Sequence, residues 1–566
     1  MVLPNSSIIN KPAMTRGLLS IAIASSLLLV GCNDDNDKIG FNNTPQHIAS
    51  FTAAQIDQEL EEASEIGKAV TPDAICGVTV EKISYQTKGS AGEATNATAA
   101  LMLPSGSADK CQGDRPVLLH AHGTATEKNY DFTQVGNTDN PAGVRATLMA
   151  ANFAAQGYIV VVPNYAGYDT STLDYHPYLN AKQQSEEMVT ALDTARALIK
   201  QQQTANKANY VKVKDSGKLF ITGYSQGGHV AMATARLLQD QNRVVTAIAP
   251  SSGPYALAAF GDAIVSGNVN AGATAFVPLL AVSLQKVDNK IYRNPTEIFS
   301  KQYADTKLPT TSSFEDLIKT GKLPKTALFQ SAPTEIPQLD PVSPSDKFGF
   351  AEENYLIQTS FRAAYLADVR SNPDGLVGGN GLLPAASPQN ELRKALKDND
   401  LRDFIPQMPT LICGGNQDPT VFFDLNSGSM AAILQQANAD SANKLNVTVL
   451  DVDTTNNDDR VQNPITPIGS ALDNPWMLTS AITDVQTKFT GTVDQVSTTA
   501  YTKAYTNAYQ KALADGKTAA QADLLAVKVG EDAAQFTVAS TYHAGLVSTA
   551  CTQATRKFFE QNFNQS

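Results

Sequence analysis

Short apolar segments alternate with helical patterns along most of the chain. Two of them, Val80–Thr87 and Ala97–Leu103, lie close together and predict a β-hairpin. Apolar runs of roughly four to eight residues are typical of strands that are buried on both faces of a parallel sheet. Six later runs fit this description: Pro116–His120, Tyr158–Pro163, Lys218–Thr222, Val244–Ala249, Pro409–Cys413 and Leu445–Val452.

A helical pattern separates the second and third of these six runs. Between Lys182 and Gln203, apolar residues recur at helical spacing and form one apolar face. Strands that alternate with helices favour an α/β architecture, in which helices flank a mostly parallel sheet and the crossovers are right-handed.

Two long stretches interrupt this alternation. Residues 254–405 are rich in proline, glycine and short mixed segments, and we interpret them as a cap, or lid, inserted between two sheet strands. Residues 454–538 contain alanine-rich helical patterns and are interpreted as a helical insertion. These boundaries leave a core in three parts: 51–253, 406–453 and 539–566.

Three tyrosines in the helical insertion are spaced four residues apart. Tyr501, Tyr505 and Tyr509 therefore form one stripe along a helix. Packing of this stripe against the protein is the simpler interpretation. A role in lining or gating a substrate entrance is the alternative.

Composition narrows the class of partner. The chain has 566 residues, more than one compact core usually holds, which agrees with a heavily inserted domain. Charged residues make up 17% and hydrophobic residues 42%, as in globular proteins. The net charge is −12 and the sequence has no basic cluster. Both features argue against nucleic acid or an anionic membrane surface as the partner.

The N-terminus has the pattern of an export signal. Lys11 and Arg16 precede an apolar stretch, Leu18–Val30, that is too short for a membrane span and fits a signal peptide. The stretch leads into Leu-Val-Gly-Cys, ending at Cys32, which resembles a bacterial lipobox. In such a sequence the cysteine is acylated and becomes the first mature residue.

This resemblance predicts a lipoprotein of the bacterial cell envelope, anchored in the membrane through palmitate or related acyl chains on Cys32. We expect residues 1–31 to be removed and the polar residues 32–50 to form a tether. Asn33 at the following position, in place of aspartate, favours the outer membrane. A plain signal peptide without lipidation, and translation from Met14, are the alternatives.

Four further cysteines suggest disulfide bonds. An even number in an oxidising compartment permits two bonds. Cys76 and Cys111 are the predicted pair, because both flank the N-terminal strands. Cys413 and Cys551 either form a second bond or are small buried residues. Their spacing does not suggest a metal site.

The motif Gly223-Tyr224-Ser225-Gln226-Gly227 matches the pattern G-x-S-x-G. The pattern alone is weak, but here it follows the strand Lys218–Thr222 and opens a helical segment. A strand, a sharp turn and a helix are the expected setting of a nucleophile elbow. We therefore predict that Ser225 is a catalytic nucleophile and that the helix N-terminus stabilises the negative charge that develops.

A serine hydroxyl needs a base, and the histidines leave one candidate. In this type of site the chain order is serine, acid, histidine. Of the six histidines only His229 and His543 follow Ser225, and His229 lies too close, on the elbow helix. Elimination therefore predicts His543 as the base, with a buried structural histidine as the alternative.

The acid is expected directly after a sheet strand. Asp418 follows the strand Pro409–Cys413 and has turn-forming neighbours, so we predict that it orients His543. A structural turn residue is the alternative at this position. Asp424, Asp451 and Asp453 are weaker candidates for the acid.

An oxyanion hole requires two backbone donors. The first is expected from Gln226, which follows the nucleophile. The second is expected from the loop after an early strand, with the N–H of Thr124 favoured and that of Gly123 as the alternative. His122 is interpreted as a residue that shapes this loop. A metal site built from His120 and His122 is disfavoured, because the sequence places no third ligand near them.

Several blocks resemble the secretory lipase family of the α/β-hydrolase superfamily. The resemblance implies an α/β-hydrolase fold with a cap over the site, hydrolysis of lipid or other carboxylic esters, no cofactor, and a triad of Ser225, Asp418 and His543. The chain departs from the family in the insertion before His543, so the resemblance does not define the substrate entrance. The blocks are Gly223–Gly228, His122–Thr124, Asn164–Tyr168, His176–Leu179 and Cys413–Pro419.

Together these features predict an esterase or lipase that forms an acyl-enzyme on Ser225. The expected partners are a lipid or small-molecule ester and, through the anchor, a membrane. A serine peptidase or an acyltransferase on the same fold is the alternative, and a non-enzymatic surface scaffold is disfavoured by the complete set of triad residues.

Overall fold

The computed structural model describes residues 44–331, 335–336, 339, 347–377, 381–440, 445–454, 465–468 and 480–563. The predicted signal peptide, Cys32 and most of the predicted tether lie outside these residues. Within the described residues, no helix has the length and apolar character needed to cross a bilayer.

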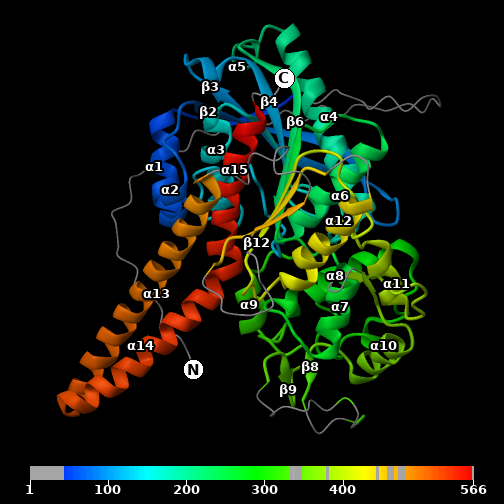
Figure 1. Ribbon diagram of the computed structural model, residues 1–566, viewed down its shortest axis with the longest axis vertical. Helices are drawn as coiled ribbons and strands as arrows, with labels where there is room; N and C mark the ends of the chain where they lie inside the picture. Colours follow the sequence, from blue (N-terminus) through cyan, green and yellow to red (C-terminus); the bar gives the residue numbers. More distant parts are fainter. Residues whose placement is uncertain are drawn as a thin grey trace, which may run out of the picture. The chain divides into compact units, whose positions relative to one another are not determined.

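A mixed sheet of ten strands forms the centre of the described region, in the order β1-β2-β3-β5-β4-β6-β7-β12-β13-β14 (Figure 1). Neighbours from β5 to β13 are parallel, and the strands outside them are antiparallel. All eight predicted strands are in this sheet, including the predicted hairpin β2–β3. The strands are β1 Gln46–Phe51, β2 Gly77–Lys88, β3 Ala94–Ser105, β4 Gly113–Ala121, β5 Ile159–Pro163, β6 Val213–Tyr224, β7 Ala247–Ser251, β12 Thr410–Gly414, β13 Val447–Asp451 and β14 Ile465–Ile468.

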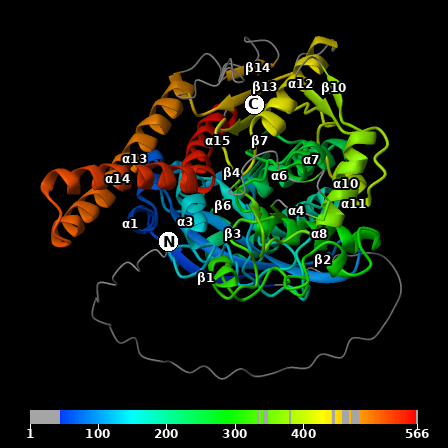
Figure 2. The same cartoon turned by 90° about the horizontal axis from the view of Figure 1, so that it is seen from below.

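Helices cover both faces of the sheet, and together with it they bury one large hydrophobic core (Figures 1 and 2). The predicted helix is α4, whose first turn is capped by the Asn180 side chain, which accepts a hydrogen bond from the Gln183 N–H. One face carries α4 Ala181–Thr204, α6 Gln226–Asp240 and α12 Ser429–Asp440, and the other carries α1 Ala53–Ala63, α2 Glu65–Val70, α3 Gly143–Asn152 and α15 Ser548–Phe563.

The chain between β7 and β12 forms a separate layer with its own hydrophobic cluster. It lies beyond the carboxyl ends of the parallel strands and appears in green in Figure 1. It carries helices and two short strand pairs, and it packs on the core beside the elbow helix. Its elements are α7 Leu257–Ser266, α8 Ala273–Asp288, α9 Phe314–Lys319, α10 Thr359–Ser371, α11 Glu391–Asp398, β8 Phe329–Gln330, β9 Phe350–Ala351, β10 Gly375–Val377 and β11 Gly381–Leu383.

A long helical hairpin precedes the predicted base. Its two helices, α13 Ser480–Ala514 and α14 Ala519–Thr541, extend away from the sheet in Figure 1. The tyrosine stripe packs against α14, as the simpler interpretation predicted. A Cβ at Gly530 would meet the Tyr501 ring at 2.8 Å, and the Tyr505 hydroxyl donates to Asp523 at 2.6 Å.

Two boundaries differ from those expected. The predicted tether ended at residue 50, but Gln46–Phe51 is an edge strand paired with β2. Only half of its residues are apolar and polar residues interrupt them, so no continuous apolar run marked it, and its pairing depends on a partner distant in sequence. Likewise, the stretch interpreted as a helical insertion also contains β14, a short edge strand antiparallel to β13.

Two disulfide bonds join distant parts of the core. Cys76 and Cys111 form the predicted bond, with their Cα atoms 5.5 Å apart. Cys413 and Cys551, for which the sequence left two interpretations open, form the second, with a Cα separation of 5.7 Å. The second bond links the end of β12 to α15.

Candidate active site

Ser225 lies in the sharp turn between β6 and α6. Its backbone has φ 61° and ψ −125°, a conformation that residues other than glycine rarely adopt. The Ser225 N–H donates to Ser251 O at 3.0 Å, which fixes the turn against the neighbouring strand. The strand, turn and helix predicted from the motif are therefore present.

The two flanking glycines make this turn possible. A Cβ at Gly223 would lie 2.0 Å from Gly227 O, and a Cβ at Gly227 would lie 1.9 Å from Ala121 O. Both contacts are to backbone atoms, which cannot rotate away as a side chain can. Only glycine therefore lets β4, β6 and α6 approach this closely around Ser225.

His543 and Asp418 form a close pair in the same region. His543 Nδ1 lies 2.6 Å from Asp418 Oδ2, although 125 residues separate the two in sequence. The other carboxylate oxygen, Oδ1, accepts from the N–H groups of Thr420 and Val421 at 2.8 and 3.1 Å. The aspartate is thus held on both sides, and both members of the pair are buried.

The second ring nitrogen of His543 is unpaired with respect to the described part of the chain. Nε2 is buried and has no hydrogen-bond partner among the described residues. His543 also lines a cavity together with Ser225. With the Nδ1 proton donated to Asp418, Nε2 is left as a free base at this cavity.

Two tyrosines hold the turn that carries His543. The Tyr224 hydroxyl donates to His543 O at 2.7 Å, and burial holds the pKa of this tyrosine well above its usual range. The Tyr542 hydroxyl donates to Asp453 Oδ2 at 2.6 Å and accepts from the Gln417 N–H at 3.3 Å. Tyr542 thereby ties the histidine turn to the loop that carries Asp418.

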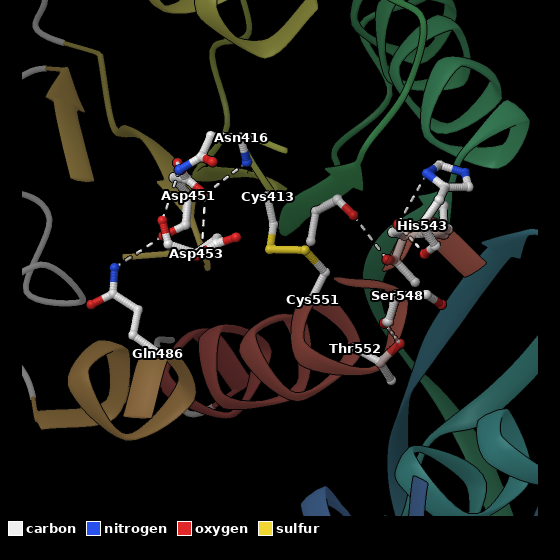
Figure 3. The surroundings of a disulfide bond; sticks show 12 residues. Cys413, Asn416, Asp451, Asp453, Gln486, His543, Ser548, Cys551 and Thr552 are labelled. Carbon is white, nitrogen blue, oxygen red and sulfur yellow. Dashed lines mark hydrogen bonds between the residues drawn. A yellow bond between two sulfur atoms is a disulfide. The ribbon is translucent and has the colours of Figure 1, made fainter. Parts of the chain in front are cut away.

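The second disulfide lies between these two groups of residues. Figure 3 shows Cys413–Cys551 between the acidic cluster around Asp451 and the His543 turn. Asp451 accepts from Asn416, and burial raises its pKa to about 7. Of the acids weighed from the sequence, Asp418 is the one bonded to the His543 ring.

The predicted oxyanion loop packs against the elbow. A Cβ at Gly123 would lie 3.2 Å from Tyr224 O, and both Gly123 and Thr124 line the cavity that contains Ser225 and His543. His122 shapes this loop as expected, since its Nδ1 lies 2.7 Å from Gly123 O.

Gln226, the other predicted donor residue, begins α6 and is held through its side chain. Its Nε2 donates to His176 Nε2 at 2.6 Å, and His176 Nδ1 in turn donates to Ala166 O at 2.8 Å. Burial lowers the pKa of His176 to about 3, which keeps its Nε2 available as an acceptor.

Ser225 separates two cavities of different character. An apolar cavity of about 60 Å³ lies under the layer between β7 and β12. A more polar cavity of about 280 Å³ lies on the side of His543. The apolar cavity is lined by Leu257, Phe260, Ile264, Phe276, Val277 and Leu280 among others, and the polar cavity by His122, Thr124, Tyr130, Arg145, Tyr224 and Ser548 among others.

Comparisons with known proteins agree with this architecture. A sequence profile of the dienelactone hydrolase family matches residues 139–259, which include the elbow but neither Asp418 nor His543. The solved structure of the rice cell wall degrading esterase LipA from Xanthomonas oryzae is similar at a TM-score of 0.54 and 27% identity, over 73% of this chain and 91% of that chain. The chain is a hydrolase with the α/β-hydrolase fold.

A further solved structure, from Legionella pneumophila, shares the fold with this hydrolase at a TM-score of 0.50 and 20% identity, over 69% of this chain and 88% of that chain. In the comparison with curated protein sequences, no protein matches the chain.

Two features of the site were missed in the sequence. Arg145 on α3 lines the polar cavity, and Tyr542 bridges the acid and histidine loops. A single arginine in an amphipathic helix, or a tyrosine beside a histidine, gives no local signal of such a role. Both roles depend on segments that are distant in sequence.

Proposed function

We propose that this hydrolase is a serine carboxylic-ester hydrolase, an esterase or lipase, that works through an acyl-enzyme on Ser225. The observation that supports it most directly is the 2.6 Å contact between His543 Nδ1 and Asp418, with Nε2 unpartnered among the described residues in a cavity that Ser225 also lines. A base oriented by a carboxylate and opposed to a strained serine is the arrangement that activates a hydroxyl nucleophile.

In the proposed reaction, Ser225 Oγ attacks the ester carbonyl carbon while His543 Nε2 takes the hydroxyl proton. Asp418 keeps the ring in the required tautomer and stabilises its charged form. The N–H groups of Gln226 and Thr124 stabilise the oxyanion. The C–O bond to the alcohol then breaks, and His543 returns the proton to the leaving oxygen. His543 then deprotonates a water molecule, whose oxygen attacks the acyl carbon. The bond between this carbon and Ser225 Oγ breaks, the carboxylic acid is released, and His543 returns the proton to Ser225 Oγ.

The two cavities indicate how the ester is oriented in the site. The general acid has to reach the leaving oxygen, so the alcohol portion occupies the polar cavity that His543 lines. The acyl portion then occupies the apolar cavity, where α7 and α8 supply aliphatic and aromatic side chains. Its volume of about 60 Å³ favours short acyl chains.

A fluorophosphonate probe tests the nucleophile. It should label the wild-type protein at Ser225 and leave Ser225→Ala unlabelled, and failure to label folded wild-type protein would overturn the proposal. A chain-length series of p-nitrophenyl esters, compared with a peptide amide, tests the bond type. We expect turnover of short-chain esters and none of the amide.

The acid can be tested against its former competitors. Asp418→Asn should lower kcat by about 10⁴-fold, because the neutral side chain favours the wrong tautomer of His543. Asp424→Asn, on the same segment after β12, is the matched control and should stay near wild type. A comparable loss in the control and a small loss in Asp418→Asn would reassign the acid.

Membership of the secretory lipase family and the lipid anchor on Cys32 belong to the same proposal. The first is supported by the sequence blocks around Ser225 and Asp418, and the second by the lipobox-like sequence. Metabolic labelling with palmitate should mark the wild-type protein in a bacterial envelope fraction and not Cys32→Ser. Equal labelling of both would contradict the anchor.

A further inference from the structure

Arg145 is a cation in the wall of the polar cavity. It is the third residue of α3 and lines the same cavity as Ser225 and His543. Its guanidinium donates to Ser548 Oγ at 2.6 Å and to Ala544 O. Both partners are neutral, and within the described residues no carboxylate forms an ion pair with Arg145.

The rest of the cavity wall does not compensate this charge. Among the residues that the structure describes, no aspartate, glutamate or lysine lines the cavity. Burial lowers the pKa values of His120 and His122 to about 3 and about 4, so both rings are neutral at physiological pH. Tyr130 and Tyr224 contribute hydroxyl groups only, and burial raises the pKa of each.

A half-buried cation of this kind, with no carboxylate partner among the described residues, is a candidate site for an anion. Burial lowers the pKa of Arg145, but a guanidinium keeps its proton at neutral pH in any case. A charge that is partly removed from water without a counter-ion loses part of its solvation free energy, and a bound anion recovers some of that loss. The planar guanidinium binds carboxylate and phosphate through two parallel hydrogen bonds.

The position of the arginine decides which part of the substrate carries the anion. Arg145 contacts Ala544, which directly follows His543, and Ser548 at the start of α15, so it stands on the side where the alcohol leaves. We propose that the alcohol portion of the substrate carries an anionic group, a carboxylate or a phosphate, that binds Arg145. This inference rests on the proposed function and names the substrate class of that same site.

The neighbouring cavity limits where the anion can bind. It shares Thr124, Tyr130 and Phe276 with the polar cavity and carries Glu127 in its wall. An anion in that neighbouring cavity would be repelled by the carboxylate of Glu127. The anionic group is therefore expected close to the ester, on the inner side next to Arg145.

Matched esters test this preference. The set consists of the propanoyl esters of 4-hydroxybenzoate, of 4-hydroxyphenyl phosphate and, as the neutral reference, of 4-hydroxybenzamide. For wild-type protein, kcat/KM should be higher for at least one charged ester by about ten-fold, the order expected for a charge-assisted hydrogen bond. The charged ester with the higher ratio identifies the anion.

Variants assign the preference to the arginine. In Arg145→Gln the ratio of charged to neutral ester should fall to near one, and Arg145→Lys should retain part of it, since it keeps the charge but not the fork. Lys200→Gln removes one positive charge from an exposed position near the end of α4 that lines neither cavity, and should keep the wild-type ratio.

Two results would overturn the proposal. One is a wild-type ratio near one for both charged esters. The other is an equal loss on charged and neutral esters in Arg145→Gln, which would make Arg145 a residue that only positions the His543 turn. Failure of the proposed function looks different, because then no ester is hydrolysed and Ser225 is not labelled by the fluorophosphonate.

A measurement on the unaltered protein keeps the test independent of how the variants fold. Free 4-hydroxybenzoate or 4-hydroxyphenyl phosphate should inhibit hydrolysis of the neutral ester about ten-fold more strongly than 4-hydroxybenzamide does. The advantage should shrink as salt is added, since the interaction is electrostatic. Equal inhibition by the charged and neutral compounds would contradict anion binding.

Discussion

The turn at Ser225 is formed by residues next to it in sequence and packs on the ends of neighbouring strands, whereas Asp418 and His543 are brought together across 125 residues. The serine turn is set by glycines on either side and by the ends of neighbouring strands. The acid–histidine pair instead depends on a disulfide, on Tyr542 and on the buried cluster around Asp451. We refer to these as the nucleophile half and the acid–histidine half of the site.

The two halves fail in different ways. In the nucleophile half, backbone atoms surround the strained turn, so this half tolerates almost no added side-chain volume. The acid–histidine half is a set of side-chain links between three loops, and each link contributes a separate, smaller share. Substitutions should therefore have one large effect in the first half and graded effects in the second.

The largest effect is expected for Gly227→Ala. The added methyl would lie 1.9 Å from Ala121 O and 2.6 Å from its carbonyl carbon, so β4 and α6 would have to separate. We expect a loss of about 4 kcal/mol or more in the free energy of unfolding, measured by urea denaturation.

Gly491→Ala on α13 is the matched control. A Cβ there meets nothing within 4 Å, so the substitution should stabilise the helix by about 0.5–1 kcal/mol. If the free energy of unfolding of Gly227→Ala lay within about 1 kcal/mol of the wild-type value, the nucleophile half would tolerate added volume, contrary to this prediction.

The next effect is expected for the double variant Cys413→Ser/Cys551→Ser. This bond closes a loop of 138 residues and fixes α15, which follows the His543 turn directly. Its removal should cost about 2–4 kcal/mol and lower kcat as well. The double variant Cys76→Ser/Cys111→Ser is the control, since it removes a bond distant from the site and should lower stability without changing kcat. An equal loss of kcat in both would remove the special role of the second bond.

The same contrast explains what could be predicted from the sequence. The elbow at Ser225 has a local pattern of strand, glycine-flanked turn and helix, and His543 followed because few histidines remained. The bond between Cys413 and Cys551 stayed open, and Arg145 had no signal at all, because each depends on the approach of distant segments. The fold class followed from buried apolar runs. The edge strand β1 was not predicted, because polar residues interrupt its apolar ones and leave no continuous run.

A smaller effect is expected for Tyr542→Phe. The buried hydroxyl links Asp453 to the Gln417 N–H, and its removal leaves that N–H without its acceptor. The loss should be about 1–3 kcal/mol in the free energy of unfolding. A decrease in kcat with little change in KM would show that the link positions the acid and histidine loops. Tyr509→Phe in the half-buried tyrosine stripe of α13, outside the site, is the control and should alter neither. Unchanged stability and kcat in Tyr542→Phe would rule the link out.

The smallest effect concerns the pH dependence of stability through Asp451. Burial raises the pKa of this carboxyl to about 7, against an ordinary value of 3.8. The folded state therefore binds a proton that the unfolded state releases between these values, so the contribution of Asp451 to stability falls as pH rises from about 4 to about 7 and is constant above. Asp451→Asn lacks this dependence. We expect the free energy of unfolding of wild type minus that of Asp451→Asn to decrease across this range by at least about 1 kcal/mol.

Asp494→Asn on the exposed side of α13 controls for the loss of one negative charge, and its difference from wild type should not follow pH in this way. The comparison isolates the cluster beside the disulfide, because Asp451 accepts from Asn416 and from the Asp453 N–H while Gln486 of α13 donates to its carbonyl oxygen (Figure 3). A flat difference between wild type and Asp451→Asn would mean that this carboxyl is already ionised throughout the range. The acid–histidine half would then rest on the disulfide and Tyr542 alone.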